Sequence, residues 1–268
     1  MKDNIVSNSI HPSALISDKA QLGTGNDIGA FVVIEDDVII GDNNTFLSSV
    51  VLKSGTRLEN NNKIHEHAVI GGLPQDLGFD AATPSFVKIG SQNTLREYVT
   101  IHRASQENEA TSLGNENYLM TQVHIAHDCQ LENNVVIAPS TGLGGFVTVE
   151  DKAFISGGVM IHQFVHIGSL AMLGGNAKIT QDILPYMMAD GNPAQISGLN
   201  KVGLRRAGFK TDDIKALKKA YQLIFNNDTK LEQRLNELSK LSDDGHVSAQ
   251  HLLSFIQASK RGFHRDKA

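Results

Sequence analysis

The sequence predicts a mainly β fold, in which short strands wind into a triangular prism over residues 1–190 and a helical domain follows over residues 191–268. Three observations lead to this prediction: an aliphatic residue at every sixth position, a small or polar residue after many of them, and a different periodicity beyond Pro185. A period of six fits neither an α-helix nor a simple alternating strand. It fits coils of three hexapeptides, whose flat sides are strands and whose corners are turns.

The six-residue period runs through most of the chain. Apolar residues occupy every sixth position from Ile10 to Ile70, and again from Ile89 to Ile179 with Glu107 as the exception, so 26 of 27 sites are filled. At the chain's 40% apolar content, the probability of this by chance is on the order of 10⁻⁹. We expect these side chains to point into the prism, and the glycines that often follow them to ease the bend at a corner. The pattern resembles the hexapeptide-repeat left-handed parallel β-helix, and the handedness is what that resemblance implies.

Two interruptions, at residues 71–88 and 104–112, are expected to form projecting loops, which often carry binding residues. Beyond a turn at residues 190–193, the apolar spacing becomes helical. Thr211 and Ser248 are expected to cap helices there. We expect these helices to pack on one another and on the open end of the prism, where they protect the sheet edges.

Composition and charge narrow the range of partners. The single cysteine, Cys129, excludes a disulfide framework, and the chain starts without a signal-peptide pattern, so we expect a cytoplasmic protein. No apolar run in the sequence is long enough to span a membrane. Residues 1–198 carry 10 basic and 21 acidic side chains, whereas residues 199–268 carry 14 and 8. This balance argues against nucleic-acid binding, and the basic end suits an acidic protein partner.

Four of the eleven histidines lie in neighbouring repeats, namely His102, His124, His127 and His162. Because one coil takes about 18 residues, we expect His127 to stack beside Gly145. The small neighbour leaves a groove beside the imidazole, and Asp128 supplies an ionisable partner. His127 and Asp128 are therefore a candidate catalytic pair.

The order of short motifs along the chain is specific. The motifs are Gln75-Asp76-Leu77, Arg96-Glu97-Tyr98-Val99-Thr100-Ile101-His102-Arg103, His124-Ile125-Ala126-His127-Asp128-Cys129, His162-Gln163-Phe164 and Gly203-Leu204-Arg205-Arg206. Together with the C-terminal helices, they resemble the UDP-N-acetylglucosamine acyltransferases over nearly the whole chain. The resemblance implies transfer of a 3-hydroxyacyl chain from acyl carrier protein to the 3-hydroxyl of the nucleotide sugar, the first step of lipid A synthesis. It also implies active sites between the subunits of a homotrimer, with no cofactor and no metal ion.

The residues themselves agree with acyl transfer. A sugar hydroxyl is a poor nucleophile at neutral pH, and the neutral imidazole of His127 can take its proton as it attacks a thioester. Asp128 can hold the ring in the required tautomer, and the backbone N–H of Gly145 can receive the developing oxyanion.

The resemblance also assigns substrate contacts along the chain. It places sugar contacts at Gln75 and Asp76, donor contacts at His124 and Gln163 with His162 in the same groove, nucleotide contacts at Asn200 and Arg206, and the limit on acyl length at Gly175. A glycine at that last position leaves room for a long acyl chain.

Four positions depart from the family pattern. Gly78, Phe146, Val202 and Ala207 stand where the family usually has a lysine, a histidine, a glutamate and an arginine. The candidate catalytic pair is kept while several acceptor contacts are not. This leaves open an N-acyltransferase that acts on another nucleotide-linked amino sugar, with acyl carrier protein or coenzyme A as donor.

Two interpretations come from other classes of protein. Carbonic anhydrases with the same β-helix bind zinc through histidines of neighbouring subunits, and His127, His162 and His166 have roughly such spacing. However, His162 and His166 take different phases of the hexapeptide, and Asp128 would have no role. A purely structural solenoid explains neither the candidate catalytic pair nor the basic C-terminal end.

Overall fold

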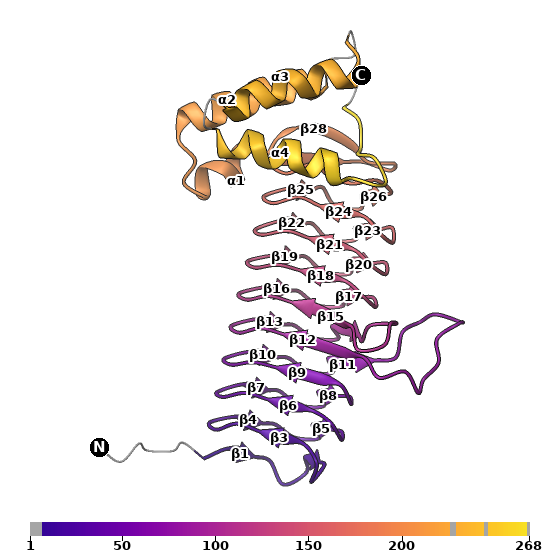
Figure 1. Ribbon diagram of the computed structural model, residues 1–268. Coiled ribbons are helices and arrows are strands. Elements are labelled where there is room, and N and C mark those ends of the chain that lie inside the picture. Colours follow the sequence, from indigo (N-terminus) through magenta and orange to yellow (C-terminus); the bar gives the residue numbers. More distant parts are fainter. Residues whose placement is uncertain (1–6, 226–228, 244–245, 267–268) are drawn as a thin grey trace.

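The computed structural model describes residues 7–225, 229–243 and 246–266, which form a left-handed parallel β-helix with helices at one end (Figure 1). The chain passes in turn through three sheets, A, B and C, which are the sides of the prism. Most strands are two residues long, because each side of the prism is one hexapeptide wide. The fold class and its handedness are those that the sequence predicts.

The strands stack coil upon coil within each sheet. Sheet A consists of β1 (Ser9–Ile10), β4 (Asp27–Ile28), β7 (Thr45–Phe46), β10 (Lys63–Ile64), β13 (Thr94–Leu95), β16 (Tyr118–Leu119), β19 (Val136–Ile137), β22 (Phe154–Ile155), β25 (Met172–Leu173), β27 (Met187–Asp190) and β28 (Gln195–Leu199). Sheet B consists of β2 (Leu15–Ile16), β5 (Val33–Ile34), β8 (Val51–Leu52), β11 (Val69–Gly72), β14 (Thr100–His102), β17 (His124–Ile125), β20 (Gly142–Leu143), β23 (Met160–Ile161) and β26 (Lys178–Ile179). Sheet C consists of β3 (Gln21–Leu22), β6 (Ile39–Ile40), β9 (Thr56–Leu58), β12 (Phe86–Ile89), β15 (Ala110–Leu113), β18 (Gln130–Leu131), β21 (Thr148–Val149) and β24 (His166–Ile167). Neighbouring strands run parallel, except that β27 and β28 are antiparallel.

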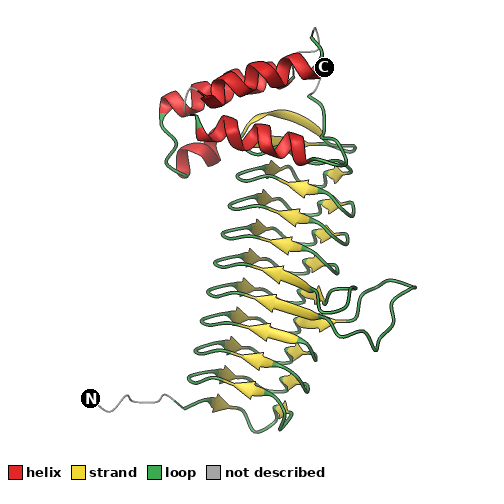
Figure 2. Cartoon of the chain, in the orientation of Figure 1, coloured by secondary structure: helices red, strands yellow, loops and turns green. Residues whose placement is uncertain are grey.

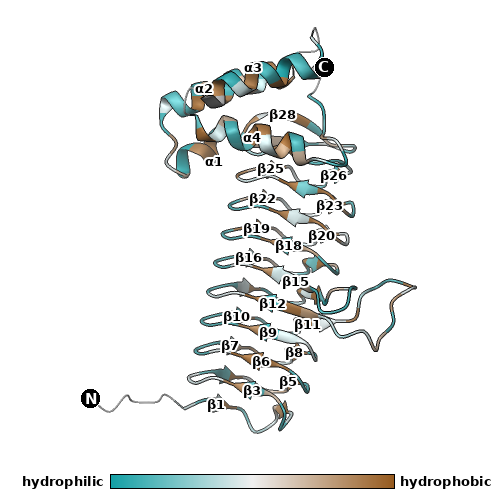
Figure 3. Cartoon of the chain, viewed as in Figure 1, coloured by the Kyte–Doolittle hydropathy of each residue, from teal (hydrophilic) through white to brown (hydrophobic). Residues whose placement is uncertain are grey.

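The aliphatic residue of each hexapeptide points into the prism, as predicted. All of these residues from Ile28 to Ile179 are buried, whereas Ile10 is 47% exposed because it lies in the first coil that the structure describes. The other residue of each strand faces outward and is often polar, so the strands combine hydrophilic and hydrophobic positions (Figure 3). The glycine after the aliphatic residue relieves crowding between coils, since a Cβ on Gly29 would lie 2.8 Å from the carbonyl oxygen of Phe46.

Both interruptions leave the prism between sheets B and C, as projecting loops on one side of the molecule (Figure 2). Their predicted bounds, 71–88 and 104–112, are wrong at the ends. The loops span residues 73–85 and 103–109, because β11, β12 and β15 extend the ladders to neighbouring coils.

Within the described residues, four helices lie at the C-terminal end of the prism: α1 (Lys201–Arg206), α2 (Thr211–Ile224), α3 (Leu231–Asp243) and α4 (Val247–Ala258). The apolar spacing of the sequence does not predict the short α1. Helix α2 begins at Thr211, but Lys210 is its N-cap, and the Asp213 carboxylate accepts the Lys210 backbone N–H. The predicted cap at Ser248 is wrong, because α4 follows directly on His246 and Ser248 lies in its first turn.

The division of the chain at residue 190 stays a prediction. Strand β27 ends at Asp190, and β28 continues sheet A beyond it. In the part of the chain that the structure describes, none of the helices has the length and apolar character needed to cross a membrane.

A buried carboxylate joins the helices to the prism. Glu150 Oε1 lies 2.9 Å from His166 Nε2, and Glu150 Oε2 lies 3.0 Å from Nε2 of His251 on α4. Ser169 donates its N–H and its hydroxyl to the same Oε2, at 2.8 and 2.9 Å. The Tyr186 hydroxyl lies 2.8 Å from His251 Nδ1. Burial alone would raise the pKa of Glu150, but these contacts outweigh it and hold the pKa well below its ordinary value.

Candidate active site

The turns that follow the strands of sheet B form one edge of the prism, here called the BC corner. Both loops, residues 73–85 and 103–109, project from it (Figure 1). In the coils above them, the BC corner carries residues 127–128 after β17, Gly145 after β20 and residues 162–163 after β23. Much of the site predicted from the sequence therefore lies along this one edge, in successive coils.

His127 and Asp128 form a largely buried pair. His127 Nδ1 lies 2.7 Å from Asp128 Oδ2, and the two side chains are 14% and 8% exposed. A Cβ added to Gly145 would lie 2.6 Å from His127 Cε1 and 2.7 Å from Nε2, so the imidazole fills the space that the glycine leaves open. Phe146 packs at right angles to the imidazole, with 5.4 Å between the ring centroids. The predicted stacking of His127 beside Gly145 is confirmed.

The backbone N–H of Gly145 lies outside the ladder between coils. Gly144 N–H donates to Ile161 O at 2.9 Å, and Phe146 N–H donates to His127 O at 3.0 Å. Among the described residues, no backbone carbonyl accepts the Gly145 N–H that lies between these two in sequence. This N–H is therefore available to bind an oxyanion beside the imidazole.

Two residues that the sequence analysis did not single out hold Asp128. The Ser105 hydroxyl donates to Asp128 Oδ2 at 2.6 Å, and the Ser105 N–H contacts Oδ2 at 3.0 Å and Oδ1 at 3.2 Å. Thr111 Oγ1 accepts the Asp128 backbone N–H at 2.8 Å. No sequence signal points to Ser105, because it precedes Asp128 by 23 residues and so falls outside the coil repeat.

Two further histidines lie beside this pair. His102 and His124 pack edge to face with 4.8 Å between ring centroids, and His124 Nδ1 lies 2.7 Å from Thr100 Oγ1. Burial, followed by repulsion from His124 and His127, lowers the pKa of His102 to about 4. Burial and then His127 also lower the pKa of His124. Both rings are therefore mainly neutral at pH 7, and His102 Nδ1 has no hydrogen-bond partner within the described residues.

The other predicted contacts on the BC corner are exposed. Gln75 and Asp76 lie in the longer loop, where the Asp76 carboxylate accepts the N–H of Gly78 at 2.8 Å. His162 and Gln163 lie two coils above His127, and both are exposed. His162 Nδ1 lies 3.2 Å from Gln163 O.

Three predicted residues lie away from the BC corner. Gly175 is in a turn between sheets A and B. Asn200 is the N-cap of α1: its side-chain oxygen accepts the Gly203 N–H at 2.9 Å, and its amide donates to Leu170 O at 2.9 Å. Arg206 is exposed at the end of α1. A single chain thus places these three residues away from the BC corner.

A cavity of about 620 Å³ lies beside α1. Its lining comes from α1 and from outward side chains of sheet A, and includes Asn200, Val202, Arg206, Ala207, Phe154, Met172 and Met188. Two of the four departures from the family pattern therefore lie in the same cavity as the two predicted nucleotide contacts.

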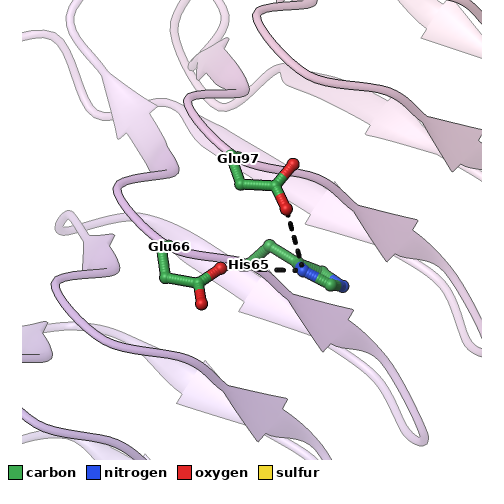
Figure 4. A group of neighbouring side chains, drawn as sticks. All are labelled: His65, Glu66 and Glu97. Carbon is green, nitrogen blue, oxygen red and sulfur yellow. Dashed lines mark ion pairs between the residues drawn. The ribbon is translucent and has the colours of Figure 1, made fainter.

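One group of three side chains with metal-ligand atoms occurs within the described residues: His65, Glu66 and Glu97, in turns between sheets A and B (Figure 4). His65 Nδ1 lies 3.7 Å from Glu66 Oε2 and 3.5 Å from Glu97 Oε1. Arg96 donates to both oxygens of Glu97, so a guanidinium already compensates that carboxylate. This group lies away from the BC corner.

The histidines of the zinc interpretation have different surroundings. His127 contacts Asp128, His166 contacts Glu150, and His162 is exposed. His166 lies in sheet C, whereas the other two lie in turns of the BC corner. The three imidazoles do not converge within the described chain.

Comparison with known proteins identifies the family of the chain. Residues 182–264 match the family UDP-N-acetylglucosamine O-acyltransferase, domain 2. The chain is 40% identical, over 96% of its length and 99% of the relative, to the acyl-[acyl-carrier-protein]–UDP-N-acetylglucosamine O-acyltransferase of Paraburkholderia phymatum, and 44% identical, over 78% and 75%, to the protein of that name from Synechocystis. The solved UDP-N-acetylglucosamine acyltransferase of Francisella novicida superposes with a TM-score of 0.93 at 30% identity, over 96% of this chain and 94% of that one. The chain belongs to the UDP-N-acetylglucosamine O-acyltransferase family.

Proposed function

We propose that the protein transfers a 3-hydroxyacyl chain from acyl carrier protein to the 3-hydroxyl of UDP-N-acetylglucosamine, the first step of lipid A synthesis. The observation that carries this proposal is the His127–Asp128 pair, whose imidazole lies against the glycine backbone of the next coil. The relatives also support the proposal, because their name specifies both the carrier-linked donor and the nucleotide sugar. These proposed substrates favour a cytoplasmic location.

In the proposed mechanism, His127 Nε2 takes the proton of the sugar hydroxyl while the hydroxyl oxygen bonds to the thioester carbonyl carbon. The carbonyl oxygen becomes an oxyanion, which the Gly145 N–H stabilises. When the carbon–sulfur bond breaks, the imidazolium returns the proton to the leaving thiolate, and the ester stays on the sugar. Asp128 stays ionised and accepts a hydrogen bond from Nδ1–H throughout, which stabilises the imidazolium.

The proposed active protein is a homotrimer, with the substrate site between chains. Gly175 and the cavity at α1 lie on other edges of the prism than His127, so a second copy is needed to bring them together. The outward side chains of sheet B include Val33, Val51 and Val69, while those of sheet C include the charged Arg57 and Lys88. An apolar side suits a subunit contact, and closed cyclic symmetry is its usual form.

The test of this function offers the purified protein several acceptors and donors and identifies the products by mass. The acceptors are UDP-N-acetylglucosamine, its 3-amino analogue and thymidine-linked amino sugars. Each is paired with 3-hydroxyacyl chains of several lengths on acyl carrier protein and on coenzyme A. We expect an ester of UDP-N-acetylglucosamine from the carrier-linked donor, and a loss of at least about two orders of magnitude in the His127→Ala control.

An N-acylated amino sugar as the only product would overturn the proposed acceptor and favour the alternative that the departures leave open. Val202 and Ala207, in the cavity with Asn200 and Arg206, are the positions where such a difference in nucleotide recognition would arise.

A further inference from the structure

We propose that Ser105 and Thr111 are positioning residues that fix the Asp128 carboxylate and thereby the tautomer of His127. This inference rests on the proposed function. Nothing in the hexapeptide repeat itself requires either contact, since Ser105 belongs to the inserted loop of residues 103–109. The loop of residues 103–109 therefore does more than connect β14 to β15, because it supplies a contact to Asp128.

The direction of the hydrogen bonds around Asp128 follows from the Ser105 backbone. A backbone N–H can only donate, and that of Ser105 contacts both carboxylate oxygens, at 3.0 and 3.2 Å, so both oxygens are acceptors. The Ser105 hydroxyl adds a second donor at 2.6 Å. Because both of its oxygens are acceptors, Asp128 accepts a hydrogen bond from Nδ1–H of His127, and the lone pair on Nε2 is then the site that can accept a proton from substrate.

Thr111 holds the backbone from which this carboxylate extends. Asp128 has a φ of 60°, in the left-handed region, and its N–H donates to the Thr111 hydroxyl at 2.8 Å. Thr111 is fully buried, so its hydroxyl has no access to bulk solvent. Removing this acceptor would leave the Asp128 N–H unpaired in the protein interior.

Ser105 is itself held by the longer loop. The Ser85 hydroxyl donates to Ala104 O at 2.5 Å, and the Asn108 N–H donates to Pro84 O at 2.8 Å. These bonds lie on either side of Ser105 along the chain. The loop that carries the proposed sugar contacts thus also supports the residue that clamps the Asp128 carboxylate.

The first experiment measures kcat and KM for Ser105→Ala, Ser105→Thr and Thr111→Val, with Ser112→Ala as the matched control. The Ser112 side chain forms no side-chain hydrogen bond with the other described residues. We expect Ser105→Ala and Thr111→Val to lower kcat about tenfold or more with KM for both substrates within twofold. Ser105→Thr should keep kcat within about threefold of the parent, because it retains the hydroxyl. Melting temperatures identify any loss of kcat that comes from unfolding.

The second experiment repeats Ser105→Ala in an Asp128→Ala background. If Ser105 acts through Asp128, the serine substitution changes residual activity by less than twofold there. An equal loss in both backgrounds, or a Ser105→Ala variant with unchanged kcat, would overturn the inference.

Nitrogen NMR of the labelled His127 ring, without substrate, tests the same contact independently of turnover. We expect the proton on Nδ1 in the parent and in Ser105→Thr, and exchange between the two ring nitrogens in Ser105→Ala. A parent-like spectrum in Ser105→Ala would overturn the inference. If the parent transferred no acyl group to any acceptor, the proposed function would fail, while these spectra would still decide whether Ser105 fixes the tautomer.

Discussion

Gly145 and His127 share one small volume between two coils. A Cβ at position 145 would lie within 2.7 Å of two imidazole atoms, which is closer than non-bonded atoms approach. The ring fits only because residue 145 has no side chain. The backbone N–H of this glycine has no backbone acceptor among the described residues.

Gly145→Ala is therefore expected to displace the His127 ring and lower kcat at least about tenfold, since even a displacement of about 1 Å can be costly in a catalytic group. Gly142→Ala, in the same coil, is the matched control, because its added Cβ meets only the flexible end of Met160 at 3.2 Å. Steady-state kinetics of both variants measure the effect. Equal activity of Gly145→Ala and the parent would mean that the ring position is not critical.

The sequence predicts some contacts between single residues and not others. The 18-residue spacing predicted that His127 and Gly145 meet, because both lie in regular coils. It could not predict the contact of Ser105 with Asp128, because the path of the loop sets that contact. The helix-cap role of Asn200 depends in the same way on the end of β28 meeting α1.

The hexapeptide pattern predicts the strands of the prism directly. The apolar spacing beyond the prism predicts the helices less accurately. Each coil strand forms where an aliphatic residue recurs, so the pattern fixes both its place and its inward face. The short α1 has too few residues to show a periodicity of its own. The start of α4 was misplaced at Ser248, because the structure begins this helix without a side-chain cap at His246.

Helix α2 provides the surface proposed for the carrier-linked donor. Lys218 and Lys219 are exposed on it, whereas Lys215 forms an exposed ion pair with Asp212 at 2.8 Å. An acidic carrier protein would be attracted to this basic face, and salt would screen the attraction.

Reversal of both charges, Lys218→Glu with Lys219→Glu, should raise KM for the carrier-linked donor severalfold and leave KM for the nucleotide sugar unchanged. Lys240→Glu on α3 is the control for a charge change elsewhere on the helices. Initial rates at low and high ionic strength measure both constants. If the KM for the carrier-linked donor changed neither with the charge reversal nor with ionic strength, α2 would be excluded as the docking surface.

At the scale of the whole molecule, Glu150 links the prism to the helical end. The pKa of Glu150 is lower in the folded protein than its ordinary value of 4.5, so the folded state binds this proton less readily than the unfolded state does. Its contribution to stability is therefore complete above about pH 4.5 and is lost as the pH falls below that value.

Glu150→Gln should lower the free energy of unfolding at pH 7 by roughly 1–3 kcal/mol, because it weakens the contacts with His166 and His251. The difference from the parent should shrink below pH 4.5, because Glu150 of the unfolded parent takes up a proton there while Glu150 of the folded parent stays ionised. Denaturant unfolding at several pH values measures this. A difference that stays constant from pH 7 to pH 3 would show that the charge of Glu150 does not contribute.

The sequence could not predict this contact, since Glu150 and His251 lie in segments of different periodicity. Neither the hexapeptide spacing nor the helical spacing relates the two positions. The repeats within one chain likewise predict the sides of the prism. They do not predict which side contacts a second copy, because the spacing relates positions within one chain only.

The central claim is that His127 of one chain acts on a nucleotide sugar held by Arg206 of another. Complementation tests it most directly: His127→Ala and Arg206→Ala chains, each weakly active alone, are produced together so that they mix within trimers. If each site takes one residue from each of two chains, random mixing should restore about a quarter of the parent activity. If both residues served the same chain, or if the protein were a monomer, the mixture would be no more active than the average of the two variants, and the account would be contradicted.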